Sequence, residues 1–213
     1  MVREIIATTL SGLYLKQEPW DKAHKLWYED ACEKLNDNSF KKWINKPDYF
    51  KGVDEVMLRL YPDLNENQRT ELARKTYFDS VLKYIKQNPD VVNKLTIDYF
   101  KLLKQDYRIA LITTNTQEAI NKILKSTGLE SFFDIIETSK PDEKDNKEIV
   151  FNRFIKKYGN PRIYIGGNRK SSYDYCNKHN INCLFANFEG LEDLEDVKSV
   201  HTLEELKKEI NKL

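Results

Sequence analysis

Four short segments rich in hydroxyl, amide and glycine residues follow apolar runs, and their residue types suit the binding of an oxyanion. The segments are residues 9–12, 113–116, 138–141 and 166–168. Thr114 and Asn115 offer hydrogen-bond donors, and Lys140 or Lys147 offers a positive charge. The turn after the first run adds backbone N–H groups, which also bind anions. We therefore expect these segments to hold a phosphate-like group if the fold brings them together.

The elements that must position these segments alternate between strand and helix. Apolar runs predict strands over residues 5–9, 108–113, 132–136, 162–165 and 182–186, and helical spacing predicts helices over residues 20–35, 66–87, 91–104, 117–126, 147–158, 171–179 and 202–210. Such alternation is typical of an α/β fold, a Rossmann-like parallel sheet with helices on both faces. Ligands bind such sheets at the carboxyl ends of the strands, where the four segments lie.

The helices that follow the first strand interrupt this alternation. We expect residues 1–16 and 89–213 to form the α/β core domain, and residues 17–88 to form a helical cap subdomain inserted after the first strand. Trp20, Trp27 and Trp43 concentrate aromatic side chains in the insert, as expected for the core of a small helical cap.

The composition limits the class of protein. The 213 residues carry 35 Lys and Arg against 34 Asp and Glu, and this net charge of +1 argues against a basic nucleic-acid or membrane-surface protein. Hydrophobic residues make up 40% of the chain, which excludes a disordered protein. Three cysteines are too few for a disulfide scaffold, and no apolar run reaches membrane-spanning length. We expect a soluble, cytoplasmic protein.

Cys176, His179 and Cys183, with His201 further on, raise the alternative of a zinc site, because thiolate and imidazole suit zinc. Their spacing fits no common zinc pattern. The positions of the two cysteines in a helix and a strand instead favour a place in the core.

Landmarks along the second half of the chain occur in a recognisable order. They are Leu111-Ile112-Thr113-Thr114-Asn115, Gly128-Leu129, Phe132-Phe133-Asp134 and Ser139-Lys140-Pro141-Asp142. In this order the chain resembles the haloacid dehalogenase-like (HAD) hydrolase superfamily over essentially its whole length. The strands of that family end in Asp-x-Asp-Gly-Thr, in Ser or Thr, in a Lys often followed by Pro, and in Gly-Asp with further acids. The resemblance implies a Rossmann-like core with a helical cap after the first strand.

The departures from the family pattern fall on its acids. Aligning Gly12 with the motif glycine places Thr9 at the nucleophile position and Ser11 at the general acid/base position. No aspartate precedes Asp21, so a shifted alignment supplies none. Gly167 stands at the position of the metal-binding Asp. The resemblance therefore implies a degenerate member that lacks the catalytic aspartates.

Phosphatase chemistry of this kind needs a carboxylate nucleophile, a second carboxylate for the proton, and acids to hold magnesium. The family's second acidic position falls on Ser171 or Ser172, and Asp174 is the one remaining candidate metal ligand nearby. We interpret the chain as a non-catalytic pseudoenzyme with no cofactor, which binds a phosphate-bearing small molecule or a protein partner but neither nucleic acid nor membrane. The expected ligand-binding residues are Thr9, Ser11, Gly12, Thr114, Asn115 and Lys140.

Alternatives to this interpretation stay open. Lys140 is followed by Pro, as in the commoner family form, and is favoured over Lys147, which opens the next helix. A rival function is that of an active phosphohydrolase with a rearranged site, which recruits Thr9, Asp174 or a cap carboxylate and uses magnesium. A third is that of a pure interaction protein, marked by a filled cleft and a large exposed apolar patch.

Overall fold

The computed structural model describes residues 3–44, 46 and 49–213, and within these ranges six parallel strands form one sheet. Their order is β3-β2-β1-β4-β5-β6. The strands are β1 (Ile5–Thr8), β2 (Arg108–Thr116), β3 (Ile135–Ser139), β4 (Ile163–Gly166), β5 (Cys183–Ala186) and β6 (Lys198–Val200). β1 pairs with β2 and β4, so the carboxyl ends of these three strands lie side by side at the centre of the sheet.

Helices cover both faces of the sheet, because successive strand residues point to opposite sides. Ile6, Ile109 and Ile165 pack on the face covered by α4 (Lys94–Leu103), α5 (Gln117–Thr127) and α8 (Leu203–Ile210). Ala7 and Ile112 pack on the opposite face, under α6 (Lys147–Tyr158) and α7 (Lys170–Lys178). This architecture confirms the predicted Rossmann-like parallel sheet.

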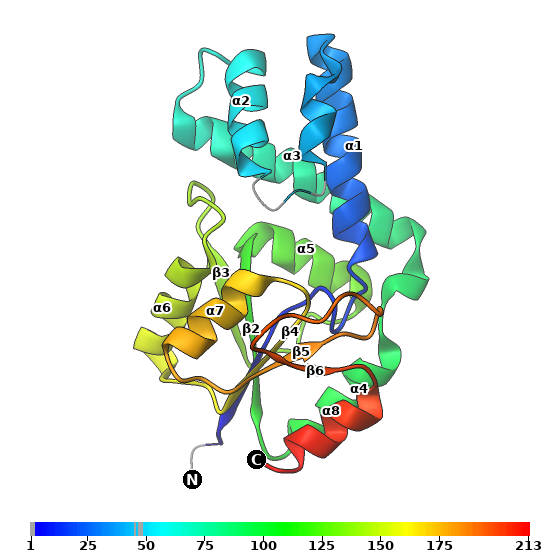
Figure 1. Cartoon of the computed structure of the whole chain (residues 1–213), viewed down its shortest axis with the longest axis vertical. Coiled ribbons are helices and arrows are strands. Elements are labelled where there is room, and N and C mark those ends of the chain that lie inside the picture. The colour runs from blue at the N-terminus through cyan, green and yellow to red at the C-terminus, as the bar shows by residue number, and fades with distance from the viewer. Residues whose placement is uncertain (1–2, 45, 47–48) are drawn as a thin grey trace.

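The chain between β1 and α4 forms a helical insert, which stands over the carboxyl ends of the strands (Figure 1). It comprises α1 (Glu18–Leu35), the 3-10 helix η1 (Asn38–Trp43), α2 (Phe50–Leu60) and α3 (Glu66–Gln87). The outer part of the insert has its own apolar cluster around Tyr28, Phe40 and Val56. Its base, with Ala23 and Val81, belongs to the same cluster as the sheet. The insert is therefore anchored to the sheet by continuous apolar packing.

Several element boundaries differ from the sequence-based prediction. The expected strand over residues 132–136 begins instead at Ile135, because Phe132 and Phe133 pack edge-on against the ring of Tyr14. The expected helix over residues 91–104 is two pieces, the 3-10 helix η2 (Pro89–Val91) and α4, since the Asn93 side chain caps α4 by accepting a hydrogen bond from the backbone of Thr96. An apolar run therefore predicts that Phe132 and Phe133 are buried, but it does not predict their backbone conformation.

Other boundaries follow local chemistry closely. Gly128 ends α5 with φ +70°, a left-handed conformation that glycine adopts without strain. Thr202 caps α8, and its hydroxyl accepts from the backbone N–H of Glu205 at 3.2 Å. No helix in the described ranges is long and apolar enough to cross a membrane.

Candidate functional site

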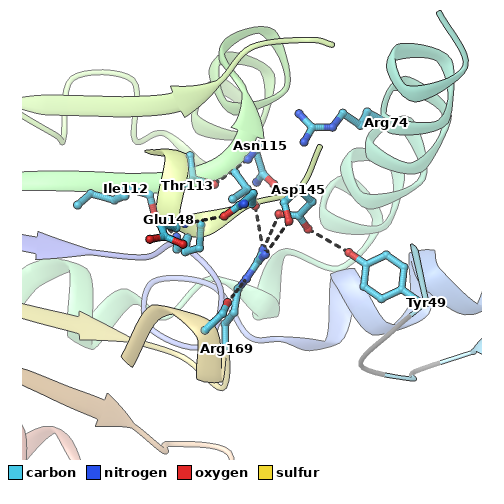
Figure 2. A network of polar contacts seen from close by, with 12 residues as sticks. Tyr49, Arg74, Ile112, Thr113, Asn115, Asp145, Glu148 and Arg169 are labelled. Atoms are coloured by element: carbon cyan, nitrogen blue, oxygen red, sulfur yellow. Dashed lines mark hydrogen bonds and ion pairs between the residues drawn. The ribbon is translucent and has the colours of Figure 1, made fainter. Parts of the chain in front are cut away.

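Arg169 brings a guanidinium group to the carboxyl end of β2. It is the residue before α7, directly after the turn that follows β4. Its Nη1 donates a hydrogen bond of 2.9 Å to the hydroxyl of Thr114, near the end of β2 (Figure 2). Thr114 is buried, so this pair fixes the guanidinium between two neighbouring strand ends. A guanidinium held in this way is suited to binding an oxyanion.

Asp145, on the loop between β3 and α6, faces the same guanidinium. Its Oδ1 lies 2.8 Å from Nη1 of Arg169, and its Oδ2 accepts a hydrogen bond of 3.1 Å from the hydroxyl of Tyr49 in the insert (Figure 2). Burial opposes ionisation of this carboxyl, but the Arg169 charge and the Thr114 hydroxyl outweigh it and lower the pKa of Asp145. The carboxylate is therefore charged at neutral pH.

Lys147, the first residue of α6, lies below these groups and is almost fully buried. Its Nζ donates a hydrogen bond of 2.5 Å to the backbone carbonyl of Ile112 in β2 (Figure 2). Burial, with a smaller contribution from the charge of Arg169, lowers the pKa of Lys147 to about 7, although Asp145 opposes the shift. At neutral pH a fraction of Lys147 is therefore the neutral amine, which takes up a proton when an anion binds nearby.

The lowered pKa of Lys147 predicts a pH dependence of stability. Between the folded-state pKa of about 7 and the usual 10.5, the unfolded chain binds a proton that the folded chain does not. The free energy of unfolding should therefore rise with pH in this window, by up to about 1.4 kcal/mol per pH unit. Urea unfolding at pH 7.5 and 9.5 measures the rise, and Lys147→Met should reduce it. An equal pH dependence of stability in both proteins would contradict the lowered pKa of Lys147.

The backbones that follow β1 and β4 are in direct contact. Gly12 has φ +76°, and a Cβ atom added to it would lie 2.8 Å from the Cα of Gly167. A Cβ added to Gly167 would lie 2.5 Å from the backbone oxygen of Ser11. Side chains are therefore excluded from both positions. Position 167, where the family pattern has an acid, has no room for one in this conformation.

Hydroxyl groups take the remaining positions around this contact. The phenol oxygen of Tyr164 adjoins the side chains of Ser172 and Thr9, and burial raises the pKa of Tyr164, so this hydroxyl stays protonated. Thr9 follows the end of β1 and is half-buried. The surroundings of this contact thus include three neighbouring neutral hydroxyl groups.

These residues do not fit the magnesium ion that the fold implies. Magnesium needs several hard oxygen ligands, usually including carboxylates, in octahedral geometry. Asp145 brings a carboxylate to the site, and Arg169 and Tyr49 already engage its two oxygens. Within the described ranges no group of three or more His, Cys, Asp and Glu side chains could hold a metal ion.

The structure brings some of the expected ligand-binding residues together. Thr114 and Asn115 lie beside Arg169 and Asp145 at the end of β2 (Figure 2). Gly12 is in the backbone contact described above, and Ser11 directs its hydroxyl to the Oε1 atom of Gln17.

Other candidates lie elsewhere. The side chain of Lys140 is exposed. Lys147, rather than Lys140, is buried near Arg169 and Asp145. Asp174 is exposed on α7 and forms an ion pair of 2.9 Å with Lys170. Cys176 is buried and Cys183 is half-buried; both are free thiols that adjoin each other.

Sequence reasoning missed Arg169, Asp145 and the insert residues Tyr49 and Arg74. Arg169 had a usable signal, because it stands one residue beyond a recognised strand-end segment. Asp145 lies in the charged run of residues 142–147, a pattern that is typical of a solvated loop. The carboxylate at the strand ends therefore comes from a loop of the core, not from the insert.

A parallel α/β sheet with a helical insert after its first strand, and polar groups at the strand ends, defines the class of Rossmann-like α/β folds with an inserted helical subdomain. The chain belongs to the haloacid dehalogenase-like hydrolase family, whose model matches residues 15–186. Among curated proteins, none matches the chain by sequence.

Solved structures share this fold at low sequence identity. A HAD phosphatase from Thermococcus onnurineus is 18% identical, with a TM-score of 0.64 and 98% of each chain covered. A β-phosphoglucomutase from Clostridium difficile is 17% identical, with a TM-score of 0.64, and 100% of this chain and 98% of that chain are covered. The magnesium-bound HAD-hydrolase YfnB from Bacillus subtilis is 14% identical, with a TM-score of 0.62, and 99% of this chain and 100% of that chain are covered. Identities this low show the fold alone.

Proposed function

We propose that this chain binds a phosphate-bearing ligand at the carboxyl ends of its strands, and that it has lost the Asp-nucleophile, magnesium-dependent phosphatase chemistry of its family. The observation that carries the proposal is the guanidinium of Arg169, fixed to Thr114 between two strand ends. A cation at this place attracts an oxyanion and repels a metal ion. The contact between Gly167 and Ser11 supports the second half of the proposal, because it excludes an acid from position 167.

The bound phosphate would share its charge among several donors. The fork of Arg169 can donate two parallel hydrogen bonds to phosphate oxygens. Thr114 and Asn115 add polar donors from β2, and Nζ of Lys147 donates to the backbone oxygen of Ile112 in the same strand. A protonated Lys147 would raise the affinity, since its charge is shielded from solvent by burial.

One observation favours a second function, that of an active hydrolase with a rearranged site. Asp145 is an ionised carboxylate at the strand ends, and such a group is the kind of nucleophile that this chemistry needs. Its two oxygens are engaged by Arg169 and Tyr49, which lowers its nucleophilicity. Turnover through Asp145 would therefore require both contacts to break.

Calorimetric titration with inorganic phosphate at pH 7.5 tests ligand binding, and turnover of phenyl phosphate with and without magnesium tests catalysis. We expect saturable binding that EDTA leaves unchanged, and no magnesium-dependent turnover. Lys147→Met should weaken binding about tenfold, the order of one charge-assisted contact, whereas Lys140→Met should leave it unchanged. Absence of phosphate binding would refute the proposed ligand, and magnesium-dependent turnover abolished by Asp145→Asn would establish the active hydrolase instead.

A further inference from the structure

The loop of residues 140–146 holds the helical insert at three points. The hydroxyl of Tyr49 donates to Asp145 at 3.1 Å, and Nη1 of Arg74 on α3 donates to the backbone oxygen of Lys140, also at 3.1 Å. Lys144 forms an ion pair of 2.8 Å with Glu66, but both side chains are more than 60% exposed. Exposed pairs contribute little. Asp145, whose side chain is only 19% exposed, therefore carries a buried contact between this loop and the insert.

The pairing of Asp145 with Arg169 is incomplete. The Oδ1 atom lies 2.8 Å from Nη1 of Arg169, yet this buried oxygen has no hydrogen bond in proper geometry to any described residue. The Nη2 atom donates to the backbone oxygen of Asp145, at 3.4 Å, and not to its carboxylate among the contacts of the described residues. The guanidinium fork is therefore not bound in the two-pronged way that a carboxylate or phosphate permits. A better-shaped oxyanion can compete for it.

Arg74 adds a second guanidinium beside Asp145. Its side chain points from α3 toward Asn115 and Asp145 (Figure 2), and its buried Nη2 has no hydrogen-bond partner among the described residues. Glu143, the other acid near Arg74, is already paired with Arg153.

The charges around Asp145 are therefore unbalanced. One carboxylate faces two guanidinium groups and cannot neutralise both. A phosphate monoester, with a charge of about −1.5 to −2 at neutral pH, matches the two guanidinium charges better.

We infer that Asp145 is an internal substitute for the anionic group of the ligand, and that a phosphate monoester displaces it. The ligand takes the guanidinium groups of Arg169 and Arg74, and Asp145 moves away together with its hydrogen bond to Tyr49. Binding thereby loosens the hold of the 140–146 loop on the insert. This inference rests on the proposed function, because it requires that phosphate binds at Arg169.

Affinity for the ligand gives the first test, with inorganic phosphate and phenyl phosphate as probes at pH 7.5. Asp145→Asn removes the competing charge while keeping the shape of the side chain, and it should tighten binding about tenfold. Arg74→Gln should weaken binding about tenfold for the same physical reason. Tyr49→Phe leaves Asp145 on Arg169 but removes a hydrogen bond that must break when Asp145 moves, so it should tighten binding by less than Asp145→Asn, about threefold.

The position of the insert gives the second test. Small-angle scattering of the wild-type protein should show a larger radius of gyration when phosphate is added, and Tyr49→Phe should show a larger radius without phosphate. If wild type binds phosphate but Asp145→Asn binds it no more tightly, Asp145 is not a substitute for the ligand, although the proposed function survives. If neither protein binds phosphate, the proposed function itself fails. A radius that phosphate leaves unchanged would overturn the loosening of the insert.

Discussion

Replacing Arg169 by glutamine is expected to lower the affinity for inorganic phosphate at least 100-fold and to destabilise the fold by about 2 kcal/mol. Both effects follow from one charge. The guanidinium is the donor between the strand ends, and it also neutralises the carboxylate of Asp145. Removing one partner of a fully buried ion pair costs about 3 to 5 kcal/mol. We expect a smaller loss of stability here because the Arg169 side chain is 37% exposed.

A double-mutant cycle separates these two roles of Arg169. Asp145→Asn in the Arg169→Gln background should recover part of the lost stability, since no buried carboxylate is then left without the charge of Arg169. It should not recover phosphate binding, because the guanidinium is still missing. Urea unfolding and calorimetric titration of the four proteins measure the two outcomes independently. Equal stability of Arg169→Gln and wild type would mean that Asp145 finds another partner or becomes protonated.

The overall fold could be predicted because local chemistry decides it. The continuous apolar run before Thr113 leaves few choices other than a buried strand, and the spacing of apolar residues in α6 fixes a helix over the predicted residues 147–158. The edge strand β6 could not be predicted, since Lys198, Ser199 and Val200 form no recognisable pattern. The strand prediction was wrong at Phe132 and Phe133, because a pair of buried apolar residues occurs both in strands and in packed loops.

The candidate site was only half predictable for a different reason. Thr114 and Asn115 were found because strand ends meet at one edge of a parallel sheet, whatever the details of packing. Asp145 and Tyr49 are 96 residues apart, and their contact depends on how the insert closes over the core. Local sequence patterns therefore do not predict this contact. The choice between Lys140 and Lys147 likewise depends on which side chain is buried. Lys140, on the loop after β3, is exposed, whereas Lys147, the first residue of α6, is buried.

Introducing an acid at position 167 should destabilise the fold, not restore a metal site. A Cβ atom there would lie 2.5 Å from the backbone oxygen of Ser11, so Gly167→Asp must push the two strand-end turns apart. We expect a loss of about 3 kcal/mol in the free energy of unfolding, at the upper end for an overpacked site. Gly167→Ala should lose nearly as much, because the clash begins at Cβ. Asn168→Asp is the matched control: it adds the same charge one residue later at an exposed position, and it should change stability by less than about 0.5 kcal/mol.

The same contact decides whether acids can be introduced at the positions that the resemblance assigns to the family's aspartates. The double variant Thr9→Asp with Ser11→Asp supplies two carboxylates and leaves Gly167 unchanged. Adding Gly167→Asp completes the family pattern. If the backbone contact is as rigid as its close approach indicates, the triple variant should be less stable than the double variant and should hydrolyse phenyl phosphate no faster, with or without magnesium. A stable triple variant that gains magnesium-dependent turnover would show that the turns can separate. In that case the contact between Gly12 and Gly167 would not be a barrier to acids at these positions.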